Sequence, residues 1–495
     1  MSFDFGLFFR LTVGGLLSFA VLGLLRPALP PFWHWAWQGV AQHAGLWLIV
    51  HAGLTMLFGR PWFAMAIGLA FLMLIVQVSN AKHHSLREAF VFQDFEYFTD
   101  AIKHPRLYIP FLGWWKFVLI AIAVAATLLV GLWAETVPAD RFAFDGLFGE
   151  LLAQLVIGFV MLIGGQGGPA LVFKPDDDAR RFGLLSCLWR YARAERRVLR
   201  LPSPWPENTE QKGERPDMVV VQSESFFDPR PLFQGIRQEV LTNFDELRVE
   251  SILHGPLDVP AWGANTVRSE FAFLSGATEE QLGVHRFNPY RRILDADVVS
   301  LAHALRADGY RTICIHPYPA SFYNRDRVYP HLGFERFIDI REFAGAKRFG
   351  PYVSDQAVAD KVRAILAEAG EPMFIFVITM ENHGPLHLEK PAAEDIPAFY
   401  SEAPPAGCDD LTVYLRHLAN SDRMLASLKE MLGAHRRPAR LCWYGDHVPI
   451  MPGVYASLGD PKGHTEYLVW SNRQKEKAPT EALSLDQLAL RLLKV

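Results

Sequence analysis

The stretch Met218–Asp228, MVVVQSESFFD, constrains the fold most, because a run of β-branched and apolar residues ends abruptly on the carboxylate of Glu224. Such a run predicts a buried strand in a sheet that is covered on both faces. Three later stretches repeat the pattern: RTICIH ends on His316, MFIFVITMENH on His383, and RLCWYGDH on Asp446 and His447. Ligands of open α/β sheets bind beyond the carboxyl ends of the strands. We therefore expect a metal-assisted catalytic site at these strand ends.

The C-terminal part of the chain alternates strand and helix patterns. Strands are predicted at 218–223, 311–316, 373–380, 439–444 and 467–471. Helical periodicity is found over Val298–Ala307, Ser354–Ala369, Asp410–Leu432 and Ser484–Leu493. This alternation predicts an α/β domain with a largely parallel central sheet and helices on both faces. The chain has neither G-x-G-x-x-G nor a Walker A motif, so a glycine-rich phosphate loop is not expected.

The first third of the chain differs, because long stretches there carry no charge. Of the 495 residues, 50% are apolar, and the excess lies before about Lys174. A bilayer is crossed by about 20 apolar residues. We predict an α-helical bundle with five membrane spans, at Leu11–Leu25, Gly45–Phe58, Pro61–Ala81, Phe117–Ala134 and Leu151–Phe173. A cleaved signal peptide would explain the first of these alone.

Charged and proline-rich residues follow the last predicted span. Asp176–Arg200 is expected to form either an interfacial amphipathic helix, with its arginines at anionic lipid headgroups, or a solvated connector. Leu201–Asp217 is rich in proline and polar residues, which is typical of a linker. We therefore divide the chain into a transmembrane domain (1–173), a juxtamembrane helix and linker (174–217) and a catalytic domain (218–495).

Charge bears on partners and on orientation. The formal net charge of -4 argues against nucleic-acid binding. With five spans, the loop Lys82–Arg106 and the segment after the last span share one face of the membrane. Both are rich in lysine and arginine, so the positive-inside rule taken alone would place the C-terminal domain in the cytoplasm.

A candidate nucleophile lies in PAWGANTVRSEFAFLSG, where Asn265 and Thr266 precede an apolar periodic run and a helix is expected to begin. Both residue types are good N-caps, which is the purely structural interpretation. The N–H groups and dipole of a helix N-terminus also attract phosphate, and metal coordination activates a hydroxyl. Adjacent Asp446 and His447 offer an oxygen and a nitrogen to one cation. Glu224 is either a third ligand or a helix-capping carboxylate.

The sequence context of the four cysteines argues against one class of hydrolytic enzyme. The four cysteines are far apart and form no C-x-x-C pair, so they provide no metal framework. Cys314 and Cys442 lie inside predicted strands and are expected to be core residues. Sulfatases need a modified nucleophile in a C/S-x-P-x-R motif, and none surrounds these cysteines. Hydrolysis of sulfate esters is therefore not expected.

In this order after a five-span anchor, the motifs QSESFFD, GANTVRSEFAFLSG, SFYNRDRVYPHLGF, TMENHGP and WYGDHVP resemble the lipoteichoic acid synthase-like phosphoglycerol transferases. That family belongs to the alkaline phosphatase/sulfatase superfamily. The resemblance covers nearly the whole chain and includes the family's loop between the third and fourth spans, at 80–105. It departs at Tyr323, where the family has tryptophan, and near Tyr318, where it has an acidic residue. Both departures concern headgroup recognition.

The resemblance implies roles for eight residues. Glu224, Thr266, Asp446 and His447 would hold a divalent metal: manganese first, with magnesium or zinc as alternatives. Thr266 would also be the nucleophile, and His383 would lie near the leaving oxygen or the phosphate. The headgroup pocket would be lined by His316, Tyr323 and Arg325, the last as a planar phosphate clamp. His387 and His464 are further candidates that a structural or rim position explains better.

The implied activity moves a phosphoglycerol group from phosphatidylglycerol in the bilayer to a glycan or glycolipid acceptor through a covalent threonine intermediate. By resemblance, the protein is a multi-pass protein of the cell (inner) membrane with its catalytic domain on the extracytoplasmic side. This expectation outweighs the charge count, because long domains translocate largely regardless of charge. The alternatives are a phosphoethanolamine transferase, a phosphodiesterase that releases glycerophosphate to water, and a non-catalytic membrane scaffold.

Overall fold

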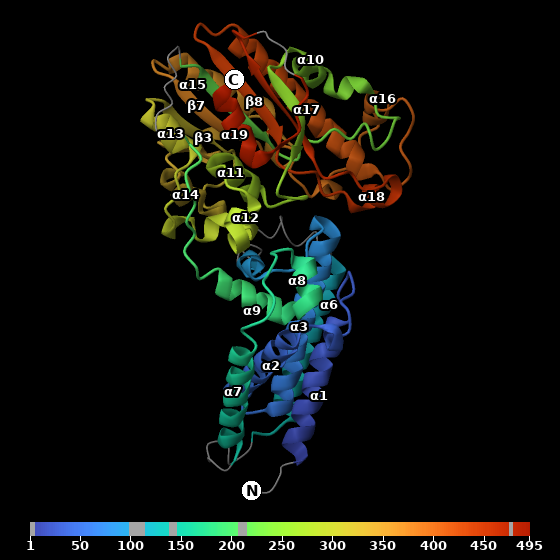
Figure 1. Cartoon of the computed structure of the whole chain (residues 1–495). Helices are drawn as coiled ribbons and strands as arrows, with labels where there is room; N and C mark the ends of the chain where they lie inside the picture. Colours follow the sequence, from blue (N-terminus) through green and yellow to red (C-terminus); the bar gives the residue numbers. More distant parts are fainter. Residues whose placement is uncertain (1–4, 99–113, 138–145, 206–214, 475–478) are drawn as a thin grey trace. The chain divides into compact units, whose positions relative to one another are not determined.

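The structure is a computed structural model that describes residues 5–98, 114–137, 146–205, 215–474 and 479–495. The chain divides into two compact units, Met1–Arg197 and Val198–Val495. The first unit is helical and the second is built around a large sheet (Figure 1).

Five long helices of the first unit overlap the five predicted spans: α1 (Phe5–Leu22), α2 (Trp37–Phe58), α3 (Pro61–Leu86), α6 (Trp114–Ala134) and α7 (Leu147–Gly164). Of these, α2, α3 and α7 are long and apolar enough to cross a membrane. The apolar parts of α1 and α6, Phe9–Leu22 and Val124–Ala134, are shorter. The described residues therefore support three spans, and the count of five is not confirmed.

Close packing of α2 on α7 depends on two glycines. A Cβ added at Gly45 would lie 2.6 Å from the carbonyl oxygen of Gly158, so only glycine lets the two backbones approach. The second span begins at Trp37 rather than at Gly45 as predicted, and α7 ends at Gly164, short of the expected Phe173.

Segment 176–200 forms two short helices, α8 (Pro175–Phe182) and α9 (Leu184–Ala194), rather than one amphipathic helix or a solvated connector. The break lies at Gly183, whose φ is +78°. A Cβ there would lie 2.1 Å from the Trp35 ring, so the indole occupies the space beside the turn. The side chains of Phe182, Leu184 and Tyr191 are buried, which ties both helices to the first unit.

The second unit contains an eight-stranded sheet in the order β10-β2-β9-β8-β1-β7-β3-β4. Strands β1, β3, β4, β7 and β8 run parallel, and β9 runs antiparallel to both of its neighbours, so the predicted largely parallel sheet is confirmed. The strand bounds are β1 (Asp217–Ser223), β2 (Leu253–Asp258), β3 (Arg311–Ile315), β4 (Arg336–Ile338), β7 (Met373–Ile378), β8 (Ala439–Gly445), β9 (Thr465–Ser471) and β10 (Leu483–Ser484).

Helices cover both faces of this sheet, because β1 sends alternate side chains to two separate cores. Val219 and Val221 pack with α10 (Thr242–Glu250), α15 (Asp355–Glu368) and α17 (Asp409–Gly433). Met218 and Val220 pack with α11 (Thr266–Ser275), α13 (Leu301–Ala307), α14 (Arg325–His331) and α19 (Leu485–Lys494). Four predicted helices correspond to α13, α15, α17 and α19. Cys314 and Cys442 are buried core residues, as expected.

Three strands of the large sheet and the two-stranded β5–β6 hairpin were not predicted from the sequence. Strand β2 is interrupted by glycine and proline in LHGPLD, and β4, β10, β5 (Arg348–Phe349) and β6 (Tyr352–Val353) contain too few residues to show periodicity. Smaller helices are α12 (Glu279–Leu282), α16 (Asp395–Phe399) and α18 (Pro452–Leu458).

Candidate metal centre and active site

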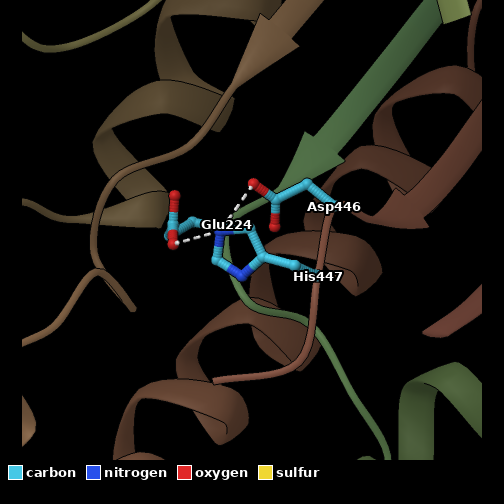
Figure 2. A group of neighbouring side chains, drawn as sticks. All are labelled: Glu224, Asp446 and His447. Carbon is cyan, nitrogen blue, oxygen red and sulfur yellow. Dashed lines mark ion pairs between the residues drawn. The ribbon is translucent and has the colours of Figure 1, made fainter. Parts of the chain in front are cut away.

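Glu224, Asp446 and His447 meet beyond the carboxyl ends of two neighbouring strands (Figure 2). One ligand atom from each lies within 4.8 Å of the others, and all three residues are buried. His447 Nε2 is 3.3 Å from Asp446 Oδ2 and 3.7 Å from Glu224 Oε1. The sequence prediction that these strand ends converge is therefore correct in its geometry.

The convergence follows from strand register. Ser223 of β1 is paired with Gly445 of β8 in parallel, so Glu224 and Asp446 leave the sheet side by side. A Cβ at Gly445 would lie 1.9 Å from the Phe226 carbonyl oxygen. The glycine thus lets the chain after β1 cross close over the end of β8.

Ser225 joins the two carboxylates, and sequence reasoning missed it. Its N–H donates to Asp446 Oδ1 at 2.8 Å, and its hydroxyl donates to Glu224 Oε1 at 2.8 Å. Its φ is +52°, a left-handed conformation that a non-glycine residue adopts at an energetic cost. Backbone strain of this kind clusters at functional sites. In the sequence, the serine directly after Glu224 in QSES is the signal that could have identified this residue.

Three observations fit a divalent cation at this centre. Asp446 Oδ2 and His447 Nε2 are buried and have no hydrogen-bond partner among the described residues. Burial, and then the neighbouring Asp446 charge, raises the pKa of Glu224; burial likewise raises the pKa of Asp446. A cation would neutralise both charges and use the vacant lone pairs through oxygen and nitrogen ligands.

Thr266 is the first residue of α11, and its side chain lies close enough to the Asp446 carboxylate to lower the pKa of that carboxyl group. The preceding Asn265 has φ +67°, and its side chain makes no capping hydrogen bond to the helix. Asn265 thus occupies the N-cap position, as predicted, but its side chain does not cap the helix. Ser269 Oγ, one turn into α11, donates to the Asp446 carbonyl oxygen at 2.7 Å, which fixes the helix against β8.

The three histidines of the predicted site share one tautomer. Each places Nδ1 on a main-chain carbonyl oxygen: His447 on Val448 at 3.1 Å, His316 on Ile378 at 3.2 Å and His383 on Gly384 at 2.6 Å. A carbonyl only accepts, so Nδ1 carries the proton and Nε2 keeps its lone pair. The Nε2 atoms of His316 and His447 are buried and have no hydrogen-bond partner in the described part of the chain. Burial also lowers the pKa of His316 and of His383, which favours the neutral rings.

Arg325 is not bound directly to the metal-ligand cluster. Its guanidinium forms a buried ion pair with Glu270 of α11, through Nη2 to Oε1 and through Nε to Oε2 at 3.2 Å. Tyr290 and Tyr329 also donate to Glu270 Oε2, at 2.9 and 2.6 Å. The Arg325 charge nevertheless reaches the site, since it contributes to lowering the pKa of His316 and opposes the rise of the Glu224 pKa. Sequence reasoning missed Glu270.

Tyr323 packs beside Arg325, with the guanidinium carbon 5.2 Å from its ring centroid. Tyr323 and Asn324 both have positive φ, of 57° and 53°, immediately before α14. Non-glycine residues with positive φ thus flank Glu224, Thr266 and Arg325 alike.

A further aromatic side chain near the site comes from the β5–β6 hairpin. The Tyr352 hydroxyl donates to the Gly384 carbonyl oxygen at 3.2 Å and lies 3.5 Å from His383 Nδ1. The centroids of the Tyr352 and His383 rings are 5.7 Å apart. The strand that presents it is two residues long, so no periodicity marked it. His387 is exposed on the following turn, and His464 is half-buried before β9.

Comparison with known proteins identifies the family. The sulfatase family model matches residues 216–494. The capsular polysaccharide biosynthesis protein RkpI of Rhizobium meliloti is 28% identical over 85% of this chain and 79% of its own length. A second Rhizobium meliloti protein, whose name refers to cyclic beta-1,2-glucan modification, is 28% identical over 60% of this chain. The chain covers only 48% of the length of that relative.

A solved structure extends the likeness to the helical unit. The superposition on the integral membrane phosphoethanolamine transferase EptA of Neisseria meningitidis covers 98% of this chain and 94% of the EptA chain, with 13% sequence identity and a TM-score of 0.58. The two proteins share a fold with apolar N-terminal helices and a C-terminal sulfatase-like domain. The chain therefore belongs to the sulfatase family.

Proposed function

We propose that this protein is a membrane-bound, metal-dependent phosphotransferase that moves a phosphoglycerol group from phosphatidylglycerol to a hydroxyl of a glycan or glycolipid. The observation that carries the proposal is the cluster of Glu224, Asp446 and His447, with the Thr266 side chain beside Asp446. A nucleophile beside a ligand carboxylate at a helix N-terminus suits attack on phosphorus.

Glu224, Asp446 and His447, together with Thr266, would hold the divalent metal. When bound, the metal supplies charge that stabilises an alkoxide and the phosphoryl oxygens. The cluster does not identify the ion; manganese, with magnesium or zinc as alternatives, is what the motif resemblance implies.

In the first half-reaction, the Thr266 oxygen forms a bond to phosphorus and the phosphorus–oxygen bond to diacylglycerol breaks. The hydroxyl proton passes to His383 Nε2, whose lone pair is available because Nδ1 donates to Gly384. The same imidazole then protonates the leaving diacylglycerol oxygen. His383 lies close enough to Asp446 for each to shift the pKa of the other.

The second half-reaction reverses the first with a new alcohol. An acceptor hydroxyl gives its proton to His383 and bonds to phosphorus, the bond to Thr266 breaks, and the proton returns to the threonine oxygen. Water in place of the acceptor would release glycerophosphate, which is the phosphodiesterase alternative. A scaffold without catalysis would not need a hydroxyl beside a buried cluster of potential metal ligands.

Headgroup chemistry favours glycerol over ethanolamine. His316 Nε2 is a buried acceptor that no described residue contacts by a hydrogen bond, so it suits a donor group of the substrate. The nearby charge is that of Arg325, and its counter-ion Glu270 already accepts from Arg325, Tyr290 and Tyr329. A neutral hydroxyl can donate to this acceptor without bringing a second positive charge near the Arg325–Glu270 pair.

The apolar helices of the first unit would hold the enzyme at its lipid donor. We place the protein in the cell (inner) membrane with the catalytic domain on the extracytoplasmic side, where glycan acceptors are found. Protease protection in oriented vesicles tests this placement. The catalytic domain should be protected in inverted vesicles and digested in right-side-out vesicles, and the opposite result would overturn the placement.

The decisive assay uses the full chain in detergent with manganese and either phosphatidylglycerol or phosphatidylethanolamine, and measures diacylglycerol release. Thr266→Ala should lower the rate by about 10³-fold or more, because the nucleophile is lost. Thr278→Ala is the matched control, since Thr278 also stands before a helix and bonds the Gln281 N–H at 3.3 Å. It should keep the wild-type rate.

Each other outcome has a defined meaning. Cleavage of phosphatidylethanolamine alone would keep the threonine chemistry and overturn the headgroup assignment. Release of free glycerophosphate in the presence of glycan acceptors would favour the phosphodiesterase. Metal binding with both lipids intact would favour the scaffold.

A further inference from the structure

The loop that carries His383 is bounded by two carboxylates, Glu381 after β7 and Glu389 after the turn Leu386–Leu388. Both contact one side chain, His417 of α17. His417 Nδ1 is 3.4 Å from Glu381 Oε1, and Nε2 is 3.1 Å from Glu389 Oε1. A single imidazole therefore bridges the two ends of the loop.

His417 differs in protonation from the histidines of the site. Both of its nitrogens face carboxylate oxygens, which only accept when ionised, so both carry a proton. Burial alone would lower the pKa of His417, but the carboxylates of Glu381 and Glu389 raise it to about 9. The ring is an imidazolium at neutral pH, whereas His316, His383 and His447 keep a free Nε2 lone pair.

Neighbouring residues hold Glu381, Glu389 and His417 in place. Glu381 also accepts from the Asp355 N–H at 2.7 Å and from Asn420 Nδ2, which ties the loop to α15 and α17. Burial, and then the Glu381 charge, raises the pKa of Asp355, whose Oδ2 accepts from the Ser421 hydroxyl at 2.6 Å. Arg416 lies 3.7 Å from Glu389 Oε2, and the Phe349 ring meets the His417 ring edge-on at 5.4 Å.

The loop conformation decides where His383 points. His383 Nδ1 donates to Gly384 within the same loop, so the orientation of its ring follows the local backbone. Tyr352 donates to the same carbonyl oxygen from the β5–β6 hairpin. A displacement of the loop would therefore move Nε2 away from the reacting oxygens, and small displacements in an active site are costly.

We propose that His417 is a positioning residue: by pairing with Glu381 and Glu389, it holds the 381–389 loop so that His383 faces the metal centre. The kinetic part of this inference rests on the proposed function, in which His383 transfers the proton. The structural part does not.

Hydrogen–deuterium exchange on the full chain in detergent tests the structural part. His417→Gln cannot donate to both carboxylates, so amides of 381–389 should exchange at least about tenfold faster. His435→Gln is the matched control, because His435 pairs with Asp217 at 2.7 Å at the opposite end of β1. It should leave the loop unchanged. If the loop exchanges equally in wild type and His417→Gln, or equally fast in both variants, the proposal is overturned.

Glu389→Gln provides a second test if His417→Gln fails to fold. Glu389 is more exposed than Glu381, and its loss releases the far end of the loop while His417 still pairs with Glu381. Faster exchange confined to the 381–389 loop is expected, and unchanged exchange would contradict the proposal that His417 holds this loop.

A double-mutant cycle tests the link to His383. His417→Gln should lower kcat for diacylglycerol release by about 10- to 100-fold in the wild-type background, but by less than about twofold when combined with His383→Ala. Equal losses in both backgrounds would show that His417 does not act through His383.

The wild-type rate should also fall as the pH rises through about 9, and the rate of His417→Gln should not show this decline. If the wild type cleaves no lipid donor while His417→Gln still speeds exchange in the loop, the proposed function fails and the positioning role of His417 is supported.

Discussion

The backbone N–H of Ser225 donates a 2.8 Å hydrogen bond to Asp446 Oδ1, which joins the end of β1 to the end of β8. The two residues are more than 200 positions apart in the sequence. The bond depends on the positive φ of Ser225, because that turn directs the N–H at the neighbouring strand end. Backbone strain and ligand orientation therefore meet in one residue.

Ser225→Gly should separate these two effects. Glycine relieves the strain of a positive φ, which compensates for the lost hydroxyl contact, so the Tm should stay close to that of the wild type. Metal affinity should fall by about 10- to 100-fold, because Glu224 loses the group that orients it. Isothermal titration with manganese measures the affinity. Ser225→Ala, which keeps the strain, should lose both affinity and Tm; unchanged affinity in both variants would contradict the orienting role.

The stability of the metal-free protein should fall as the pH rises above the ordinary carboxylate range. Burial raises the folded-state pKa of Glu224 and of Asp446 above the ordinary values of these carboxyl groups, 4.5 and 3.8. The folded state then binds more protons than the unfolded state above those values, so unfolding becomes easier with increasing pH. A divalent metal competes with these protons, and its stabilising effect should grow in the same direction.

Thermal unfolding at pH 5 and pH 8, with and without manganese, measures this effect. The Tm increase on adding metal should be larger at pH 8. The variant Glu224→Gln removes one titrating carboxylate and should reduce both the pH dependence and the metal effect. A metal effect that is equal at the two pH values would contradict the assigned ligands.

Glu270→Gln should destabilise the catalytic unit by about 3–5 kcal/mol, because it leaves the buried Arg325 charge without its partner. Tyr329→Phe removes one hydrogen bond to Glu270 and should cost about 1 kcal/mol. Chemical denaturation followed by tryptophan fluorescence measures both. Asp360→Asn is the control, since its pair with Arg363 is exposed and should contribute less than about 1 kcal/mol. A Glu270→Gln protein as stable as the control would exclude the ion pair as a structural anchor.

The catalytic strands were predictable because each is a continuous apolar run, and a run buried on both faces leaves few alternatives. The runs at β1, β3, β7 and β8 also end on the residues that reach the carboxyl edge of the sheet. Membrane helices were predictable in position for the same reason, although length decided which of them qualify as spans. Strand β2, by contrast, is held by pairing with β9 across the sheet, and local sequence does not specify that partner.

The sequence by itself determined that Glu224, Asp446 and His447 stand at strand ends and that Thr266 begins a helix, since hydrophobic runs and their termination are local properties. Tertiary structure alone decided which strands are neighbours, and hence that these ligands meet at one point. It also decided the partners of Arg325 and His417. A buried charge takes the counter-charge that folding brings beside it, and Glu270, Glu381 and Glu389 come from elements whose spacing in the chain gives no sign of that contact.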